Sequence, residues 1–194
     1  QIEGIEADDV IATLARRASE QQFQTVVSTS DKDLAQLVNE HVTLVNTMSN
    51  EKLDVAGVER KFGVPPGRIV DYLTLIGDSV DNVPGVDKVG PKTAAKWLHE
   101  YGSLDGLVAN AHAIKGAVGE NLRKALPWLP TARKLVTIRD DCNLGQEFES
   151  IESLAVQPQD TERLREPYAR HESKVWLREI DNANVTNALD SAAV

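Results

Sequence analysis

Apolar positions in the first part of the chain alternate between helical and extended spacing. They recur at i, i+3 and i+4 across residues 5–17, which predicts a helix. The β-branched run at 25–29 predicts a short buried strand, residues 31–38 return to helical spacing, and residues 42–46 predict a second strand. This order indicates an α/β fold with a parallel sheet, in which ligands bind at the carboxyl ends of the strands.

From residue 55 onward the pattern is helical. Two of the expected helices begin at Pro66 and Pro91, where the missing N–H of proline costs nothing. Residues 136–139 are expected to return to the sheet, and from Asp181 the chain is polar and small, as in a linker or tail. The expected helices span residues 55–62, 66–76, 91–101, 104–110, 119–126, 129–135 and, as the last one, 161–171.

Composition excludes several classes of protein. With 194 residues and 41% hydrophobic positions, the chain can bury a core, which argues against global disorder. The single cysteine, Cys142, rules out an internal disulfide framework and suits a reducing cytoplasm. No apolar run approaches the roughly 20 residues that cross a bilayer, and the acidic start resembles no secretory signal. We expect a soluble intracellular protein without a membrane partner.

The net charge of −9 opposes a broadly basic, nucleic-acid-binding surface. Much of the acidity is concentrated, however, in three compact groups. Without their seven members, 23 of the 30 acidic residues remain against 21 Lys and Arg, a balance of −2. The excess negative charge is therefore concentrated in a candidate metal site, where two divalent cations would offset most of it, and the rest of the protein is near neutral. The groups are Glu6, Asp8 and Asp9; Asp31 and Asp33; Asp78 and Asp81.

Each group alone also has a purely structural explanation. The first lies in a helix N-terminal turn that favours negative charge, Ser30–Asp33 resembles a capping box, and the third pair fits an ordinary turn. Their joint placement favours a metal site, because Asp31 and Asp33 directly follow a strand and Glu6 and Asp9 share one helix face. Oxygen ligands without His or Cys select Mg²⁺ or Mn²⁺, and two such ions about 4 Å apart hydrolyse phosphodiesters.

A glycine-punctuated stretch follows the third acidic pair. Residues 84–90 lead into a helix that carries Lys92 and Lys96. The N–H groups of a Gly-rich turn at a helix N-terminus bind phosphate, although the glycines alone also fit a plain tight turn. Carboxylates beside a phosphate-binding turn indicate metal-dependent chemistry on a nucleic-acid backbone.

These motifs resemble those of the 5′-nuclease (flap endonuclease) superfamily. Glu6-Ala7-Asp8-Asp9, Ser28-Thr29-Ser30-Asp31-Lys32-Asp33 and Gly77-Asp78-Ser79-Val80-Asp81-Asn82 are similar to its successive acidic motifs. Pro84-Gly85-Val86 and Gly90-Pro91-Lys92-Thr93-Ala94 resemble its helix-hairpin-helix DNA element. Asn46-Thr47-Met48, residues 72–78 and Lys174-Val175-Trp176 are similar to the 5′→3′ exonuclease domains of bacterial DNA polymerase I. The specific motifs span residues 4–97, and a looser similarity reaches about residue 180.

The resemblance implies a domain organisation. Residues 1–50 would form the C-terminal part of a PIN-like α/β nuclease core, residues 51–180 a helical region with the helix-hairpin-helix element, and residues 181–194 a linker or tail. Family members begin with a strand bearing a metal-binding aspartate, a further aspartate and a basic arch, which have no counterpart here. We therefore expect a chain that lacks the N-terminal portion and whose parent continues into proofreading and polymerase domains.

The resemblance also assigns roles to residues. It implies two Mg²⁺ or Mn²⁺ ions, a potassium ion bound by backbone carbonyls, and duplex DNA with a 5′ flap, nick or end. The implied catalytic metal ligands, direct or through water, are Glu6, Asp8, Asp9, Asp31, Asp33, Asp78 and Asp81. The implied DNA contacts are Lys88, Val89, Gly90, Pro91, Lys92, Thr93 and Lys96. The implied potassium ligands are the carbonyls of Leu75, Ile76, Pro84, Val86 and Val89.

The function expected from this reading is a metal-dependent 5′→3′ exonuclease or flap endonuclease. It would hydrolyse phosphodiesters near the 5′ end of duplex DNA in replication and repair, in the bacterial cytoplasm at the nucleoid. Two alternatives remain open: a catalytically incomplete module that binds duplex DNA without cutting, and a stand-alone flap nuclease. A non-cutting module would be expected to lose several acids, whereas all seven matched positions are filled.

Overall fold

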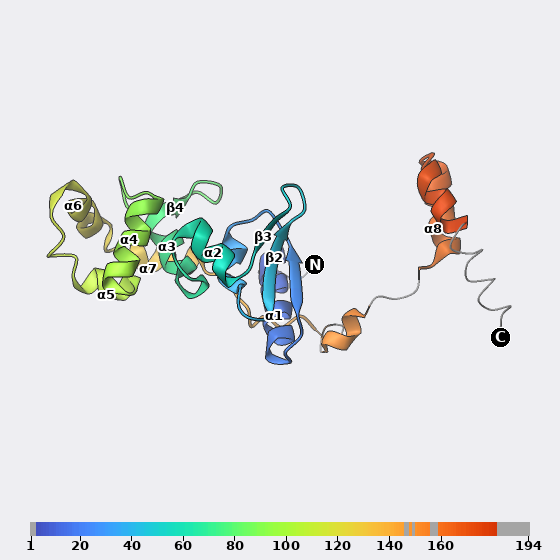
Figure 1. Cartoon of the computed structure of the whole chain (residues 1–194), viewed down its shortest axis with the longest axis horizontal. Helices are drawn as coiled ribbons and strands as arrows, with labels where there is room; N and C mark the ends of the chain where they lie inside the picture. Colours follow the sequence, from blue (N-terminus) through green and yellow to red (C-terminus); the bar gives the residue numbers. More distant parts are fainter. Residues whose placement is uncertain (1–2, 146–147, 149, 156–158, 182–194) are drawn as a thin grey trace. The chain divides into compact units, whose positions relative to one another are not determined.

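The structure is a computed structural model that describes residues 3–145, 148, 150–155 and 159–181 (Figure 1). The chain divides into two compact units, residues 1–153 and residues 154–194. The first unit contains all three acidic groups and the glycine-rich hairpin, so it holds the candidate site.

A three-stranded sheet forms one part of the first unit. Its order is β1 (Thr25–Ser28), β2 (Val42–Asn46) and β3 (Glu51–Leu53). β1 and β2 pair in parallel, which confirms the predicted strands, and β3 adds to β2 antiparallel. β3 was not predicted, because it is three residues long and partly polar. The turn before it is held by the Asn46 side chain, which accepts the N–H of Met48 at 2.9 Å.

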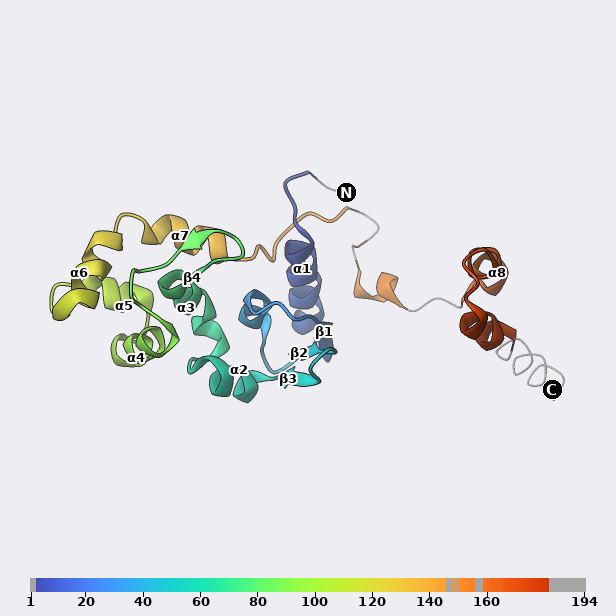
Figure 2. The same cartoon turned by 90° about the horizontal axis from the view of Figure 1, so that it is seen from above.

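Helix α1 (Ala7–Glu20) packs against this sheet (Figure 2). Its buried positions include Ala12, Ala15 and Ala18, whose small side chains allow close approach to buried Val27 of β1. The predicted helix at residues 5–17 is thus confirmed with shifted ends. The helical spacing at 31–38 corresponds to a 3₁₀ helix, η1 (Asp33–Leu37), rather than an α-helix.

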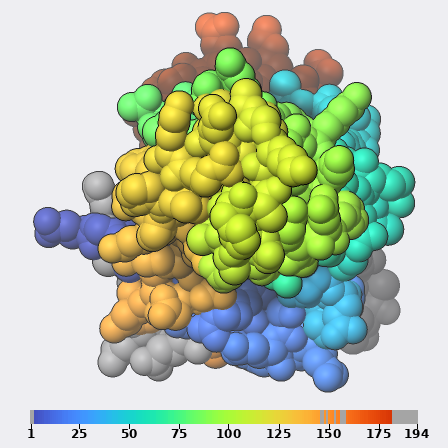
Figure 3. Space-filling view, turned by 90° about the vertical axis from the view of Figure 1, so that its left-hand side faces the viewer, coloured from blue at the N-terminus to red at the C-terminus, as the bar shows by residue number. Residues whose placement is uncertain are grey.

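The remainder of the first unit is mainly helical, as predicted, apart from the strand pair β4 (Gly77–Asp78) and β5 (Val83–Pro84). α3 (Ile69–Ile76) lies at its centre, packs against α4 (Pro91–Tyr101) and α7 (Leu129–Val136), and buries Ile69, Leu73 and Leu75 completely. Figure 3 faces the surface formed by this helical part. The expected helix at 66–76 is divided into a 3₁₀ turn and an α-helix. The elements are α2 (Val55–Phe62), η2 (Pro66–Arg68), α3 (Ile69–Ile76), α4 (Pro91–Tyr101), α5 (Leu104–Ala109), α6 (Gly116–Ala125) and α7 (Leu129–Val136).

The predicted return to the sheet at residues 136–139 is wrong. α7 continues to Val136, and residues 137–142, here called the strap, run along α1 without joining a strand. Instead of strand partners, side chains of α1 and η1 accept hydrogen bonds from the backbone N–H groups of the strap. The N–H of Ile138 donates to Gln36 at 3.1 Å, that of Arg139 to Asp9 at 2.9 Å, and that of Cys142 to Thr13 at 3.1 Å.

The second unit contains α8 (Thr161–Arg170), which confirms the predicted helix at 161–171. Asp160 caps it by accepting the N–H of Arg163 at 3.0 Å. Residues 174–181 are also helical, so α8 is not the last helix. A further 3₁₀ turn, η4 (Ile151–Leu154), lies at the boundary between the units. The predicted tail beyond Asp181 lies outside the described residues. Among the described helices, none is long and apolar enough to cross a membrane.

Candidate metal centre and nucleic-acid interface

Three carboxylates from two parts of the chain meet in the first unit. Asp33 begins η1, Asp78 ends β4 (Gly77–Asp78), and Asp81 lies in the turn to β5 (Val83–Pro84). One oxygen of each lies within 4.8 Å of the others. Asp33 and Asp78 are buried, whereas Asp81 is exposed. The structure therefore brings together three of the seven acids singled out in the sequence, and we call these three the Asp33 cluster.

Asp33 is the cluster member that has a buried carboxylate oxygen without a hydrogen bond from the described residues. Its Oδ1 is buried and has no hydrogen-bond partner among the described residues. Burial, followed by the charges of Asp31 and Asp78, raises the pKa of Asp33 to about 7. A buried carboxylate oxygen without a donor, facing two further carboxylates, fits a hard divalent cation. The residues present therefore suit the metal ion that the sequence implies.

Asp78 is satisfied within the protein. Its Oδ2 lies 2.7 Å from the Lys32 ammonium, and its Oδ1 accepts the N–H of Val80 at 2.8 Å. Burial opposes ionisation, but the hydrogen bond and charge of Lys32, together with the N–H groups of Val80 and Asp81, outweigh it and lower the pKa of Asp78. The sequence analysis assigned no role to Lys32, although its position between Asp31 and Asp33 was a visible signal.

Two further acids of the sequence motifs, Asp8 and Asp31, interact electrostatically with members of the Asp33 cluster. Burial raises the pKa of Asp8, and the charges of Asp31 and Glu6 raise it further, with a smaller contribution from Asp81. Asp8 therefore lies within the electrostatic field of the cluster. Asp31 is exposed, and its Oδ1 accepts the N–H of Asp33 at 2.9 Å, so it also shapes the local turn.

Asp9 has a different set of contacts. Its Oδ2 lies 3.0 Å from the Arg139 guanidinium and accepts the N–H of Glu6 at 3.2 Å. Burial opposes ionisation, but the Arg139 N–H, side chain and charge, together with the N–H of Glu6, outweigh it and lower the pKa of Asp9. Glu6 and Asp9 line a neighbouring cavity of about 810 Å³ between α1, α7 and the strap. Arg139 carried no sequence signal, because it lies 130 residues from Asp9.

Two glycines shape the backbone of the hairpin. A Cβ on Gly77, whose φ is +76°, would lie 2.3 Å from the Gly85 nitrogen. A Cβ on Gly85 would lie 2.3 Å from the Ile76 carbonyl carbon. Only glycine at both positions permits this approach, which brings β4 and β5 together and holds Asp78 at the cluster.

Three of the five carbonyls implied as potassium ligands already accept hydrogen bonds. Leu75 accepts from the N–H of Val86 at 2.8 Å, and Val86 accepts from that of Val89 at 3.0 Å. The Trp128 indole N–H donates to Pro84 at 2.7 Å. These bonds fix the carbonyl directions in the hairpin, and each carbonyl oxygen retains a second lone pair.

The residues implied in DNA contact continue from this hairpin. Lys88 is exposed at a φ of +61°, and Gly90 precedes α4, which begins at Pro91. Lys92 and Lys96 are exposed and lie one helical turn apart on α4. Val89 is buried, so it anchors the turn through packing, and Thr93 is half-buried. Asn121 of α6 donates to the carbonyl oxygen of Asp87 at 2.9 Å and ties the hairpin to the helical part.

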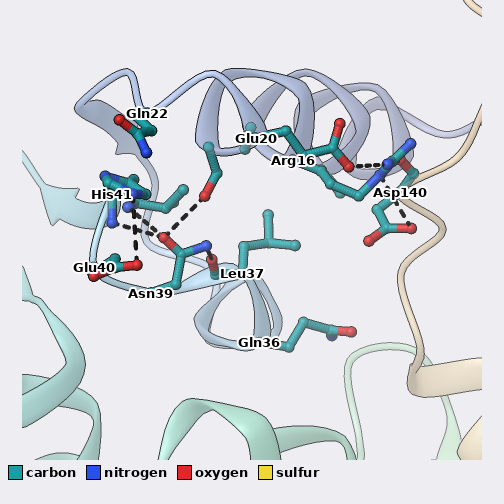
Figure 4. Close-up of a pocket in the computed structure, with 13 residues that line it drawn as sticks. Arg16, Glu20, Gln22, Gln36, Leu37, Asn39, Glu40, His41 and Asp140 are labelled. Carbon is teal, nitrogen blue, oxygen red and sulfur yellow. Dashed lines mark hydrogen bonds and ion pairs between the residues drawn. The ribbon is translucent and has the colours of Figure 1, made fainter.

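A further cavity of about 440 Å³ lies at the opposite end of the strands (Figure 4). Its charged groups pair with one another: Arg16 contacts Glu20 at 2.5 Å and Asp140 at 3.8 Å. The N–H groups of His41 and Val42 donate to Asn39. Because parallel sheets place ligands at the carboxyl ends of their strands, this cavity is not the candidate site.

A small sheet with a carboxylate cluster, joined to a helical part with a glycine-rich hairpin, defines a two-part nuclease fold. Two family models match accordingly: the 5′-3′ exonuclease N-terminal resolvase-like domain at residues 1–63, and the 5′-3′ exonuclease C-terminal SAM fold at residues 64–162. The chain belongs to the 5′-3′ exonuclease family, which confirms the resemblance inferred from the motifs.

Individual relatives agree with this assignment. The chain is 42% identical over 191 residues to DNA polymerase I of Pseudomonas aeruginosa, covering 92% of this chain and 20% of the relative. It is 39% identical over 181 residues to a 5′-3′ exonuclease of Aquifex aeolicus, covering 93% of this chain and 61% of the relative. The chain thus spans less than two thirds of either protein. The structure of a mutant T5 5′-exonuclease has the same fold, with a TM-score of 0.64 and 20% identity over 70% of this chain and 56% of that one.

Proposed function

We propose that this chain acts in metal-dependent 5′→3′ exonuclease or flap endonuclease cleavage of DNA. The substrate would be duplex DNA with a 5′ end, nick or flap, and the role would be replication and repair. The observation that carries the proposal is the buried Asp33 Oδ1, which has no partner in the described part of the chain and lies within 4.8 Å of the Asp78 and Asp81 oxygens. An oxygen-only cluster of this kind favours Mg²⁺ or Mn²⁺.

The metal ligands would be drawn from the seven acids, directly or through water. Asp33, Asp78 and Asp81 would form the inner group, with Asp8 and Asp31 beside them and Glu6 and Asp9 at the margin. Bound divalent ions supply a water of lowered pKa and stabilise the departing oxygen. The protein contributes by burying Asp33, by fixing Asp78 through the Gly77–Gly85 contact, and by leaving Asp81 open to solvent and substrate.

The hairpin would hold the duplex. Lys88, Lys92 and Lys96 are exposed cations, and the N-terminal turn of α4 offers backbone N–H groups to phosphate. A potassium ion on the carbonyls of residues 75, 76, 84, 86 and 89 would strengthen this grip, supported by the directions that Trp128 and Val86 give to those carbonyls.

The domain organisation and setting are proposed on the same basis. Residues 1–50 would be part of the nuclease core, residues 51–180 the DNA-gripping region, and residues 181–194 a linker. The relatives named DNA polymerase I support a parent with proofreading and polymerase domains, acting in the bacterial cytoplasm at the nucleoid. A stand-alone nuclease is the alternative, supported by the relative from Aquifex aeolicus.

One observation favours a second candidate, a duplex-binding module without cleavage. Asp9, a member of the first acidic motif, is engaged by Arg139 and not by the Asp33 cluster. In that case the hairpin would be the functional part, and the carboxylates would be incomplete as a catalytic centre.

Cleavage of a 5′-labelled flap duplex in Mg²⁺ or Mn²⁺, with EDTA as control, separates the two candidates. We expect short 5′ products that depend on metal, and a loss of about 100-fold or more in Asp81→Ala. Asp141→Ala, an exposed aspartate of the strap, is the matched control and should cut normally. Duplex binding without cleavage would establish the second candidate, and absence of both binding and cleavage would contradict both.

A further inference from the structure

Lys32 forms an ion pair with the Asp33 cluster, and its role follows from where its ammonium lies. Nζ is 2.7 Å from Asp78 Oδ2, and the Lys32 side chain is 37% exposed, so it reaches the cluster from the solvent side. Its surroundings also include Asp31 and Asp33, whose charges act on it together with that of Asp78. One fixed positive charge therefore already lies among carboxylates that would bind divalent metal.

The two buried carboxylates differ in what remains for a ligand. Asp33 Oδ1 has no partner among the described residues, whereas both oxygens of Asp78 are occupied, Oδ1 by the N–H of Val80 and Oδ2 by Lys32. A metal ion can bind Asp33 Oδ1 without disturbing any described hydrogen bond. To bind Asp78 through Oδ2 it must share that oxygen with the ammonium or displace it, and like charges at such distances repel.

We propose that Lys32 is an internal counter-cation that occupies Asp78 in the metal-free protein and competes with divalent metal for it. This inference rests on the proposed metal site and adds a determinant of its affinity. Lys32 stabilises the empty cluster by offsetting carboxylate repulsion, and it raises the metal concentration needed to fill the site. The solvent exposure of its side chain lets the ammonium leave Asp78 without unfolding the surrounding backbone.

The competition has a reciprocal consequence. If Lys32 lowers metal affinity, metal lowers the affinity of Lys32 for Asp78 by the same factor. Removing the positive charge must therefore do two things at once. The substitution lowers the stability of the metal-free protein, because Asp78 is left buried beside other carboxylates without its counter-charge. It also increases the affinity for metal.

The test is a titration of the full chain with MnCl₂ and with MgCl₂ by calorimetry, together with melting temperatures in EDTA. Lys32→Gln is expected to lower the half-saturating metal concentration by roughly tenfold and to melt earlier than wild type in EDTA. Lys32→Arg keeps the charge and should retain the wild-type metal concentration. If Lys32→Gln does not fold, Lys32→Arg still tests the proposal. A decrease of roughly tenfold in the half-saturating metal concentration of Lys32→Arg would overturn it.

Lys61→Gln is the matched control. Lys61 lies 2.7 Å from Glu51 with a side-chain exposure of 39%, nearly the same geometry away from the cluster. It removes the same charge and should leave the metal titration unchanged.

The outcomes distinguish this inference from the proposed function. Metal binding by wild type with an unchanged or higher half-saturating concentration in Lys32→Gln would overturn the competition while leaving the metal site intact. No heat of binding in either protein would overturn both. Binding by Lys32→Gln at concentrations where wild type does not bind would support both.

Discussion

Arg139 holds Asp9 through both its backbone and its side chain: the backbone N–H lies 2.9 Å from Oδ1, and the guanidinium lies 3.0 Å from Oδ2. An aspartate from an acidic motif thus serves as an anchor for the strap. The pKa of the neighbouring Asp8, in contrast, is raised by burial and by the charges of other carboxylates. Two adjacent acids of one motif are therefore predicted to respond to mutation in opposite ways.

Asp9→Ala should lower the free energy of unfolding by about 1–3 kcal/mol, because it leaves the N–H groups of Arg139 and Glu6 without their acceptor. Asp8→Ala is the matched control and should not destabilise the metal-free protein, since it removes a repelled charge. Urea unfolding in EDTA measures both. Equal losses in the two variants would contradict the anchoring role of Asp9.

The metal-free protein should lose stability as the pH rises from about 4 to about 7. The pKa of Asp33 is about 7 in the folded protein against an ordinary value of 3.8, so within this range the folded protein keeps the proton that the unfolded chain releases. Its contribution is therefore fully present below about pH 4 and lost by about pH 7, on the order of 1.4 kcal/mol for each unit of pKa difference.

Asp33→Asn isolates this effect, because it removes the titrating group while keeping the shape. Chemical unfolding at several pH values in EDTA should give a flatter profile for the variant than for wild type. In Mg²⁺ the wild-type decrease should shrink, since metal binds the deprotonated carboxylate. Parallel profiles for the two proteins would show that Asp33 is not the group responsible.

Lys92→Ala should weaken duplex binding and reduce the slope of log affinity against log salt by about one unit, since one phosphate contact is lost. Binding to a labelled duplex in EDTA, measured by anisotropy across salt concentrations, tests this without cleavage. Lys52→Ala, an exposed lysine of β3, provides the comparison and should keep the wild-type slope. A slope unchanged in Lys92→Ala would mean that this lysine contacts no phosphate.

Gly85→Ala should destabilise the first unit by about 1–3 kcal/mol, because its Cβ would lie 2.3 Å from the Ile76 carbonyl carbon. Gly67→Ala is the control, since a Cβ there meets nothing within 4 Å. Thermal unfolding compares the two variants. If Gly85→Ala melts like wild type, the close approach of β4 and β5 is not needed for the fold.

Local pattern predicted much of this fold. The strand Val42–Asn46 and the helices Val55–Phe62 and Pro91–Tyr101 have the predicted bounds, because each combines clear periodicity with a turn or cap signal. The Asp33 cluster was within reach of the sequence as well, since its members flank recognisable turns. β3 was not, because it is three residues long and partly polar, and the strap was not, because its partners are distant in sequence.

The same limit applies to the site. Arg139 and Trp128 act on residues 130 and 44 positions away, and no local pattern reports such contacts. Lys32 was within reach, because a lysine between two aspartates is visible in the sequence, but its partner Asp78 follows only from the three-dimensional structure.

The strap has a consequence for how the chain folds during synthesis. Four side chains near the start of the first unit make hydrogen bonds to residues 138–142 in addition to their local ones: those of Asp9, Thr13, Arg16 and Gln36. A ribosome that adds about 5–20 residues per second would leave α1 without these contacts for several seconds. The sheet and α1 are then expected to remain loosely assembled until the helical part is made, so a segment made late in the first unit completes one made earlier.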